Sequence, residues 1–304
     1  MDFELFILGC NSAIPAHGRH PTAQLLRLDN HSYLIDCGEG TQMRLMQYKL
    51  RKSRVNQIFI SHLHGDHVYG LIGLLTSLNL AGRQTPLQLF GPQGLQELIE
   101  TTARLSGCIF SYPIQYTQVD TETSAHLFSD DLLDVYSIPL VHRVPTCGYL
   151  FKEKQRPLNL RPGIVEQWQI PYQDIPGIKA GQDWLSPSGQ LIPNGELCLP
   201  PTPTRSYAYC SDTAYSEVIV PLIQGCNLLY HEATFLHELA EQATFTKHST
   251  ALQAAQIARQ ASAKQMIIGH YSSRYITPDA LVAEAQTVFP NTLAAVEGQL
   301  YPIP

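Results

Sequence analysis

Short apolar runs alternate with amphipathic stretches along most of the chain. Apolar runs bounded by Gly, Pro or Asn predict strands at 3–9, 23–28, 32–38, 57–61, 87–92, 131–142, 146–153, 206–212, 227–234, 265–270 and 292–300. Stretches with helical spacing predict helices at 40–50, 68–82, 93–105, 249–261 and 278–288. This alternation predicts a layered α/β architecture, in which sheets bury one face on each other and carry helices outside.

Residues 154–205 differ from the rest of the chain. They are rich in proline and contain few long apolar runs, as a linker would. The segment nevertheless includes Trp168, Tyr172 and Trp184, which are too apolar for a pure spacer. We therefore favour an ordered insertion or protruding arm, carried by a single domain that spans residues 1–304.

Composition suits an ordinary globular protein of 304 residues, with 44% hydrophobic and 15% charged residues. No apolar run approaches the roughly 18–20 residues that span a bilayer. The N-terminal residues MDFELFILGC carry two acids and no cationic region, so we expect a cytoplasmic protein without a secretory signal.

Charge and cysteine content narrow the chemistry further. The net charge of −6 disfavours a purely electrostatic nucleic-acid binder, so contact with RNA would depend on local patches or on metals. The seven cysteines are scattered and never spaced as C-x-x-C. That spacing disfavours both a disulfide framework and a thiolate zinc site.

The stretch SHLHGDH at 61–67 directly follows a predicted buried strand. It places His62, His64, Asp66 and His67 within six positions. Imidazole and carboxylate donors at this density suit zinc or a related transition metal, without any thiolate. Surface histidines are the alternative, and the H-x-H-x-D-H pattern makes it the weaker one.

Single His or Asp residues end three other predicted strands. These residues are His142, Asp212 and His270. Each one alone has an ordinary interpretation as a capping residue or a core polar residue. Because functional side chains commonly lie on loops that leave the edge of a packed sheet, the three residues and the first motif together predict a larger metal site.

This pattern of histidines and aspartates resembles that of the metallo-β-lactamase fold. The resemblance implies an αββα sandwich of two mixed sheets with outer helices, one sheet from each half of the chain. More specific stretches resemble the tRNA 3′-processing endoribonuclease, RNase Z, and follow that family's order over nearly the whole chain. They are DCGEGTQ (36–42), SHLHGDH with GLIGLL (61–75), SDT (211–213), HEATF (231–235), KHS (247–249) and GHYSSRY (269–275).

The resemblance implies two Zn²⁺ ions per subunit, with Mn²⁺ or another divalent metal as the alternative. One ion would bind His62, His64 and His142. The other would bind Asp66, His67 and His270, with Asp212 bridging both ions.

Two such ions activate a bridging hydroxide and neutralise charge on a phosphoryl group. The expected products are a 3′-hydroxyl on the tRNA and a 5′-phosphate on the trailer. Asp66 would accept or orient the water proton, and His248, held by Glu232, would protonate the leaving group. Asp36 and Thr213 would hold the ligand imidazoles, with turn or capping duty as the alternative.

RNA contacts are less clearly marked. Five cations within 43–54 could neutralise phosphates, or they could form a solvated helix end. Arg274 follows His270 by four residues and is a phosphate candidate, while Arg19 is retained from a family loop that reads the 3′ end. The insertion at 154–205 occupies the position of the family's tRNA-binding arm. Its balance of six basic and five acidic residues between 152 and 205 departs from the Gly/Lys/Pro-rich arm expected there.

Three functional hypotheses follow. The first is a zinc-dependent endoribonuclease that removes 3′ trailers from precursor tRNA, acting as a homodimer without membrane contact or another protein partner. The second keeps the metals but hydrolyses a small phosphodiester or an aryl sulfate. The third, a non-enzymatic RNA-binding scaffold, is disfavoured because none of the seven expected ligands is missing.

Overall fold

The computed structural model describes residues 2–304, which divide into two compact units. The larger unit comprises residues 2–152 and 205–304, and the smaller one comprises Glu153–Thr204. None of the helices within residues 2–304 is long and apolar enough to cross a bilayer.

The first sheet of the larger unit has seven strands in the order β16-β1-β2-β3-β4-β5-β6. The pairs β16–β1, β1–β2 and β2–β3 are antiparallel, whereas the pairs β3–β4, β4–β5 and β5–β6 are parallel. The strands are β1 (Phe3–Gly9), β2 (Ala23–Leu28), β3 (His31–Ile35), β4 (Val55–Phe59), β5 (Leu87–Gly91), β6 (Ile114–Gln118) and β16 (Leu300–Pro302).

The second sheet also has seven strands, in the order β15-β14-β13-β12-β9-β8-β7. Strands β12 through β15 run parallel, so their carboxyl ends meet at one edge of the sheet. The strands are β7 (His126–Ser129), β8 (Leu133–Pro139), β9 (Cys147–Glu153), β12 (Ser206–Cys210), β13 (Leu228–Glu232), β14 (Gln265–Gly269) and β15 (Thr292–Ala294).

Aromatic side chains fill the space between the two sheets. Phe59 of the first sheet packs against Tyr149 and Phe151 of the second, with ring centroids 5.2 and 5.3 Å apart. In β1, Leu5 joins this inner core, whereas the next residue, Phe6, joins the core beneath the helices. Both faces of the strand are therefore buried, as its continuous apolar run indicates.

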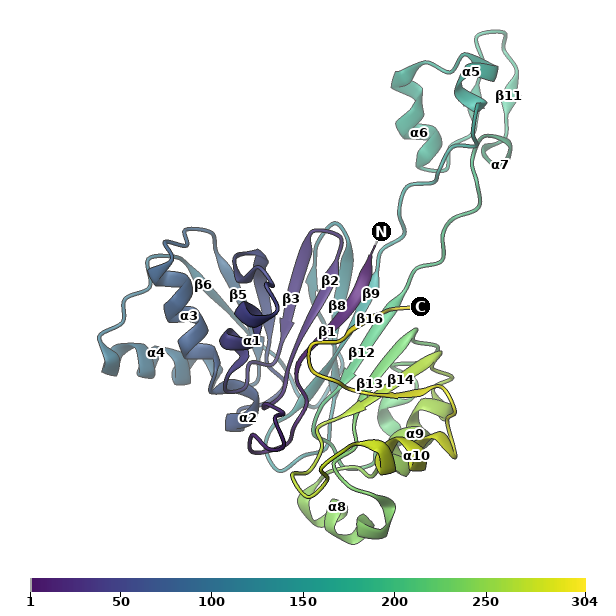
Figure 1. The fold of residues 1–304 in the computed structure, drawn as a ribbon. Coiled ribbons are helices and arrows are strands. Elements are labelled where there is room, and N and C mark those ends of the chain that lie inside the picture. The colour runs from purple at the N-terminus through teal and green to yellow at the C-terminus, as the bar shows by residue number, and fades with distance from the viewer. Residues whose placement is uncertain (1) are drawn as a thin grey trace. The chain divides into compact units, whose positions relative to one another are not determined.

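Helices cover the outer faces of both sheets (Figure 1). Leucines of α3 pack on the first sheet, and alanines of α9 pack on the second. Helix α9 begins with a capping box between Thr250 and Gln253. The helices of this unit are α1 (Thr41–Gln47), α2 (Gly65–Val68), α3 (Leu71–Leu80), α4 (Leu95–Ser106), α8 (Ala240–Thr246), α9 (Ala251–Gln260) and α10 (Asp279–Gln286), with 3₁₀ turns η1 (Lys52–Arg54), η3 (Glu217–Ile219) and η4 (His237–Leu239). The predicted αββα sandwich is confirmed.

Two predicted elements differ from the structure. The strand expected at 292–300 is two strands, because β15 ends in the second sheet and β16 pairs with β1 in the first. Gly298 turns the chain between them at a φ of 83°, a conformation that glycine adopts without strain. The helix expected at 68–82 is α3, which is shorter, and a separate one-turn helix, α2, precedes it.

The smaller unit has an apolar core of its own. Its elements are α5 (Ile164–Trp168), η2 (Tyr172–Asp174), α6 (Ile175–Lys179), β10 (Trp184–Leu185), β11 (Leu191–Ile192) and α7 (Asn194–Leu197). Trp184 is buried in this core, and its indole nitrogen donates to Asp174 at 2.8 Å. Buried aromatic and aliphatic side chains thus hold this proline-rich segment in one conformation.

Candidate metal centre

Seven histidine and aspartate side chains converge in the larger unit, and each lies in a loop or short helix that follows the carboxyl end of a strand. His62 and His64 follow β4, Asp66 and His67 lie in α2, and His142, Asp212 and His270 follow β8, β12 and β14. They form two groups whose donor atoms lie within 4.8 Å of one another: His62, His64, His142 and Asp212, and Asp66, His67 and His270. The structure therefore brings together every metal ligand predicted from the sequence.

Asp212 lies between the two groups and turns one carboxylate oxygen toward each. Its Oδ2 is 3.7 Å from Nε2 of His62 and 3.8 Å from Nε2 of His142. Its Oδ1 is 3.3 Å from Nε2 of His67 and 3.2 Å from Nε2 of His270. This is the position that a bridging ligand would take.

Four of the imidazoles have a hydrogen-bond partner at Nδ1, and these bonds leave Nε2 of each ring facing the donor groups. The pairs are His62 Nδ1 with Ser61 Oγ at 3.0 Å, His67 Nδ1 with Asp36 Oδ2 at 2.7 Å, His142 Nδ1 with the carbonyl of Lys247 at 2.9 Å, and His270 Nδ1 with Thr234 Oγ1 at 2.9 Å. Such partners fix the ring orientation and tautomer of a metal-binding histidine.

Asp36 is the most heavily used of these partners. Its buried carboxylate accepts the backbone N–H of Ser61 at 2.7 Å and the hydroxyl of Ser61 at 2.8 Å. It also accepts the Tyr209 hydroxyl at 2.5 Å, in addition to the bond with His67. The φ of Asp36 is 54°, a left-handed conformation that aspartate tolerates better than most residues.

Burial keeps several of the imidazoles neutral. Desolvation lowers the pKa of His62, His64 and His142, and the neutral ring is the form that binds a metal. Burial raises the pKa of the Asp66 carboxyl, but the neighbouring His67 ring more than offsets this and leaves it well below its usual range. Asp66 is therefore ionised, as a ligand must be.

The charge around His67 supports a cation site. Burial opposes protonation of this ring, yet the carboxylates of Asp212, Asp66 and Asp36 raise its pKa well above the usual value. A buried cluster with this excess of negative charge fits a divalent cation, and its oxygen and imidazole donors suit zinc or manganese.

His248 lies beside the donor groups and is held by Glu232. Its Nδ1 bonds Oε1 of Glu232 at 2.8 Å. The same carboxylate accepts the backbone N–H of Thr213 at 3.0 Å and the hydroxyl of Thr234 at 2.6 Å. Burial alone would lower the pKa of His248, but Glu232 raises it to about 9. The ring can therefore carry a proton at neutral pH.

The donor groups open into a cavity of about 340 Å³. The cavity is lined by Ser12, Ala13, His64, Asp66, His142, Arg143, Asp212, Thr234, Phe235, Thr246, His248, His270, Ser272, Ser273 and Arg274. Arg274 is exposed, and its guanidinium lies 5.3 Å from the ring centroid of Phe235. A phosphate in the cavity would thus lie near a cation as well as the donor groups.

Arg19 and Arg44 use their guanidinium groups within the fold. Arg19 donates to Asn11 at 2.8 Å and to the carbonyls of Tyr275 and Ile276 at 2.6 and 2.7 Å. It therefore supports the loop that carries Arg274. Arg44 is buried against Glu297, so it does not belong to the surface patch considered for 43–54.

Several contributors to the site carry little or no signal in the sequence. Ser61 and Thr234 fall inside the SHLHGDH and HEATF stretches and could have been inferred from them. Tyr209 reads as a core residue of β12, the carbonyl of Lys247 carries no side-chain signal, and Ala13 donates its backbone N–H to Asp66 at 2.7 Å. Only the folded chain reveals these three.

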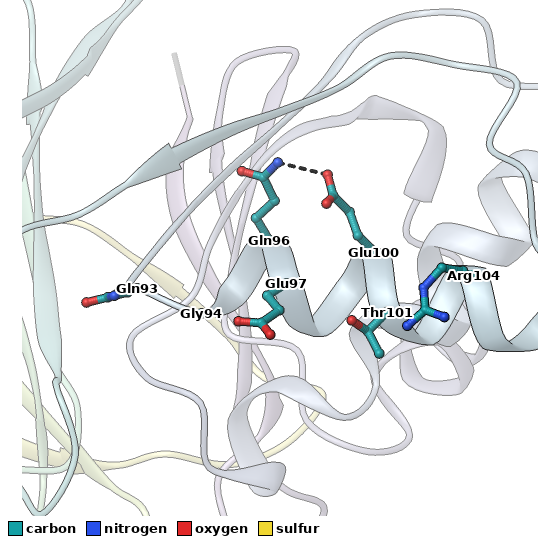
Figure 2. A pocket seen from close by; sticks show the side chains of 7 residues that line it. All are labelled: Gln93, Gly94, Gln96, Glu97, Glu100, Thr101 and Arg104. Carbon is teal, nitrogen blue, oxygen red and sulfur yellow. Dashed lines mark hydrogen bonds between the residues drawn. The ribbon is translucent and has the colours of Figure 1, made fainter.

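A second hollow, of about 430 Å³, lies along α4 (Figure 2). Gln96 donates to Glu100 at 2.8 Å on the surface of this helix. The hollow is lined by Gln93, Gly94, Gln96, Glu97, Glu100, Thr101 and Arg104. This hollow is larger than the cavity over the donor groups, but its lining includes none of the His/Asp clusters found among the described residues. We interpret it as a solvated helix face.

Solved structures identify the class of this fold and site. The metallo-β-lactamase fold protein YhfI from Bacillus subtilis aligns over 99% of this chain and 100% of its own, with a TM-score of 0.70 and 18% identity. Human tRNase Z, short form, aligns over 99% of both chains with a TM-score of 0.70 and 26% identity. The protein therefore has the metallo-β-lactamase fold.

Sequence relatives narrow the class to one family. The chain is 46% identical over 295 residues to ribonuclease Z of Porphyromonas gingivalis, covering 97% of both sequences. Residues 3–129 also match the family of the anti-Pycsar protein Apyc1, which is less than half of the chain. The chain belongs to the ribonuclease Z family and is a metal-dependent endoribonuclease of this fold.

Proposed function

We propose that this protein removes 3′ trailers from precursor tRNA, with two zinc ions in the candidate metal centre. The observation that carries the proposal is the convergence of all seven donors in a chain 46% identical to a ribonuclease Z over nearly its full length. The relative is named a ribonuclease and the human structural neighbour a tRNase, so tRNA is the substrate class that their names support.

The two donor groups would each hold one ion. His62, His64 and His142 would bind the first, Asp66, His67 and His270 the second, and Asp212 would bridge them. Divalent ions at such a centre act as Lewis acids on a phosphoryl oxygen and lower the pKa of bound water. Manganese or another divalent ion could take the place of zinc because imidazole and carboxylate ligands suit several metals.

Asp66 and His248 would manage the protons. The ionised carboxylate of Asp66 can orient the attacking water and accept its proton. His248, protonated and held at Nδ1 by Glu232, can give a proton from its other ring nitrogen to the departing 3′-oxygen. The products would be a tRNA ending in a 3′-hydroxyl and a trailer beginning with a 5′-phosphate.

The substrate would be held at two places. Arg274 at the cavity would contact a phosphate, while Arg19 keeps the loop of Arg274 in place. The smaller unit, Glu153–Thr204, would bind tRNA away from the metals, as its place in the sequence suggests. We further propose that the protein is cytoplasmic and forms a homodimer. Light scattering of the purified protein would test the dimer.

The test is incubation of the purified protein with a precursor tRNA that carries a 3′ trailer, and separately with bis-p-nitrophenyl phosphate. Both reactions should stop with chelator and resume when zinc or manganese is restored. Cleavage of the small ester without cleavage of the precursor tRNA, in the presence of either metal, would favour a small-molecule phosphodiesterase instead.

The role of the smaller unit has its own test. Replacement of residues 160–200 by a short linker should weaken binding of precursor tRNA but spare hydrolysis of the small ester. Equal loss of both activities would mean that the segment serves the fold rather than the substrate.

A further inference from the structure

An exposed aromatic ring lies next to the mouth of the cavity and is not explained by packing. Phe245, near the end of α8, is 75% exposed. Its ring lies 5.5 Å from the guanidinium of Arg143, which itself lines the cavity. A single exposed apolar residue is common on proteins. Phe245 differs because its contacts with Arg143 hold it beside the cavity.

Two bonds fasten this pair to the metal centre. Arg143 directly follows the proposed ligand His142 and donates to the carbonyl of Phe245 at 3.0 Å. His142 Nδ1 donates to the carbonyl of Lys247, two residues after Phe245, at 2.9 Å. The loop after β8 and the end of α8 are thus joined twice, and the ring keeps a fixed place relative to His142.

The remaining donors of Arg143 face no partner within residues 2–304, so they are open to a phosphate. Apart from the proposed ligands and His248, the charged side chains that line the cavity are Arg143 and Arg274. A chain with a net charge of −6 therefore presents a locally cationic rim at its metal centre. An aromatic ring beside such cations is the combination that binds single-stranded nucleic acid.

We propose that Phe245 and Arg143 form a nucleotide-binding subsite, in which the base of the last nucleotide retained on the tRNA stacks on Phe245 and Arg143 contacts an adjacent phosphate. This inference rests on the proposed endoribonuclease function. The side is assigned by position: His248, which the proposed function places beside the departing 3′-oxygen of that same nucleotide, lies three residues after Phe245, and its ring centroid is 5.1 Å from that of His142. The subsite selects an unpaired, stackable nucleotide before the scissile bond.

The test uses three precursor tRNAs that differ only next to the mapped cleavage site: an intact one, one abasic at the nucleotide before the bond, and one abasic after it. The wild type should lose about tenfold in kcat/KM on the first abasic substrate, since stacking of one base on an aromatic ring has about this effect. Phe245→Ala should show the same loss on the intact substrate and no further loss on that abasic substrate. Phe245→Tyr should restore wild-type behaviour.

Metal content of each variant separates this role from a structural one, and Arg104→Ala on α4 is the matched control for Arg143→Ala. Arg143→Ala should raise KM several-fold with unchanged metal content, whereas Arg104→Ala should behave as wild type. Additive losses in Phe245→Ala, or sensitivity only to the abasic nucleotide after the bond, would overturn the inference. A wild type that cleaves none of the three substrates would overturn the proposed function, and the subsite with it.

Discussion

Asp36→Asn is the change that probes the support of the metal centre most sharply. Asparagine keeps the size of the side chain and tolerates the left-handed backbone at this position, where φ is 54°. It removes the negative charge that faces Nδ1 of His67 at 2.7 Å. The backbone should therefore remain in place while the bonding around His67 changes.

The structure sets the size of the effect. Oδ1 of Asp36 accepts the Ser61 N–H, and Oδ2 accepts from Ser61 Oγ, His67 and Tyr209. An amide has only one acceptor oxygen, so either the Ser61 N–H or the group of three donors loses its partner. A buried donor without a partner costs about 1–3 kcal/mol, and the weaker bonds of a neutral acceptor add to this. We expect a loss of about 2–4 kcal/mol in the free energy of unfolding.

Metal affinity should fall as well, by about 10- to 100-fold, because the outer partner of a ligand imidazole fixes its orientation. Urea unfolding of chelator-treated protein measures the first effect, and calorimetric titration with zinc measures the second. The matched control is Glu297→Gln, a buried carboxylate that accepts from Arg44 and His20 and belongs to neither donor group. The Glu297→Gln variant should be less stable to urea than the wild type but should bind zinc with unchanged affinity. Unchanged zinc affinity in Asp36→Asn would refute the positioning role.

Three further predictions follow. His248→Ala should lose about 10²–10⁴-fold in kcat on precursor tRNA and far less on a p-nitrophenyl ester, whose leaving group needs no proton; equal losses would rule out the acid role. Asp212→Ala should contain less metal by atomic absorption and lack activity, and full activity would refute the bridging position. Gly38→Ala would place a Cβ 2.3 Å from the carbonyl oxygen of Asp66, so the loop must shift; we expect lower zinc affinity, and an unchanged titration would show that the turn adapts.

The metal donors outside SHLHGDH could be predicted because each one follows an apolar strand within three residues. The apolar runs QMIIG and SYAYC show where two strands end. His270 directly follows the first run, and Asp212 follows the second after a single Ser. The parallel pairing of β12, β13 and β14 then brings these residues to one edge. A local pattern and a simple sheet rule together determine the position of the ligands.

Other features depend on contacts that no local pattern contains. Tyr209 and Asp36 are 173 positions apart and meet only because the two sheets stack in one register. Arg19 was expected to contact substrate, and its bonds to the backbone carbonyls at 275 and 276 are contacts that the sequence did not reveal. The division of 292–302 between two sheets depends on pairing with β1, which is distant in sequence.

The central claim is that this chain cleaves precursor tRNA with two metal ions held by seven side chains. Its most direct test is to remove all metal, add zinc in measured equivalents, and follow cleavage of a trailer-bearing precursor tRNA at each step. The account predicts no cleavage without metal and full cleavage at two equivalents per chain, with a 3′-hydroxyl on the tRNA product. Full cleavage in the metal-free protein, or at one equivalent, would contradict it.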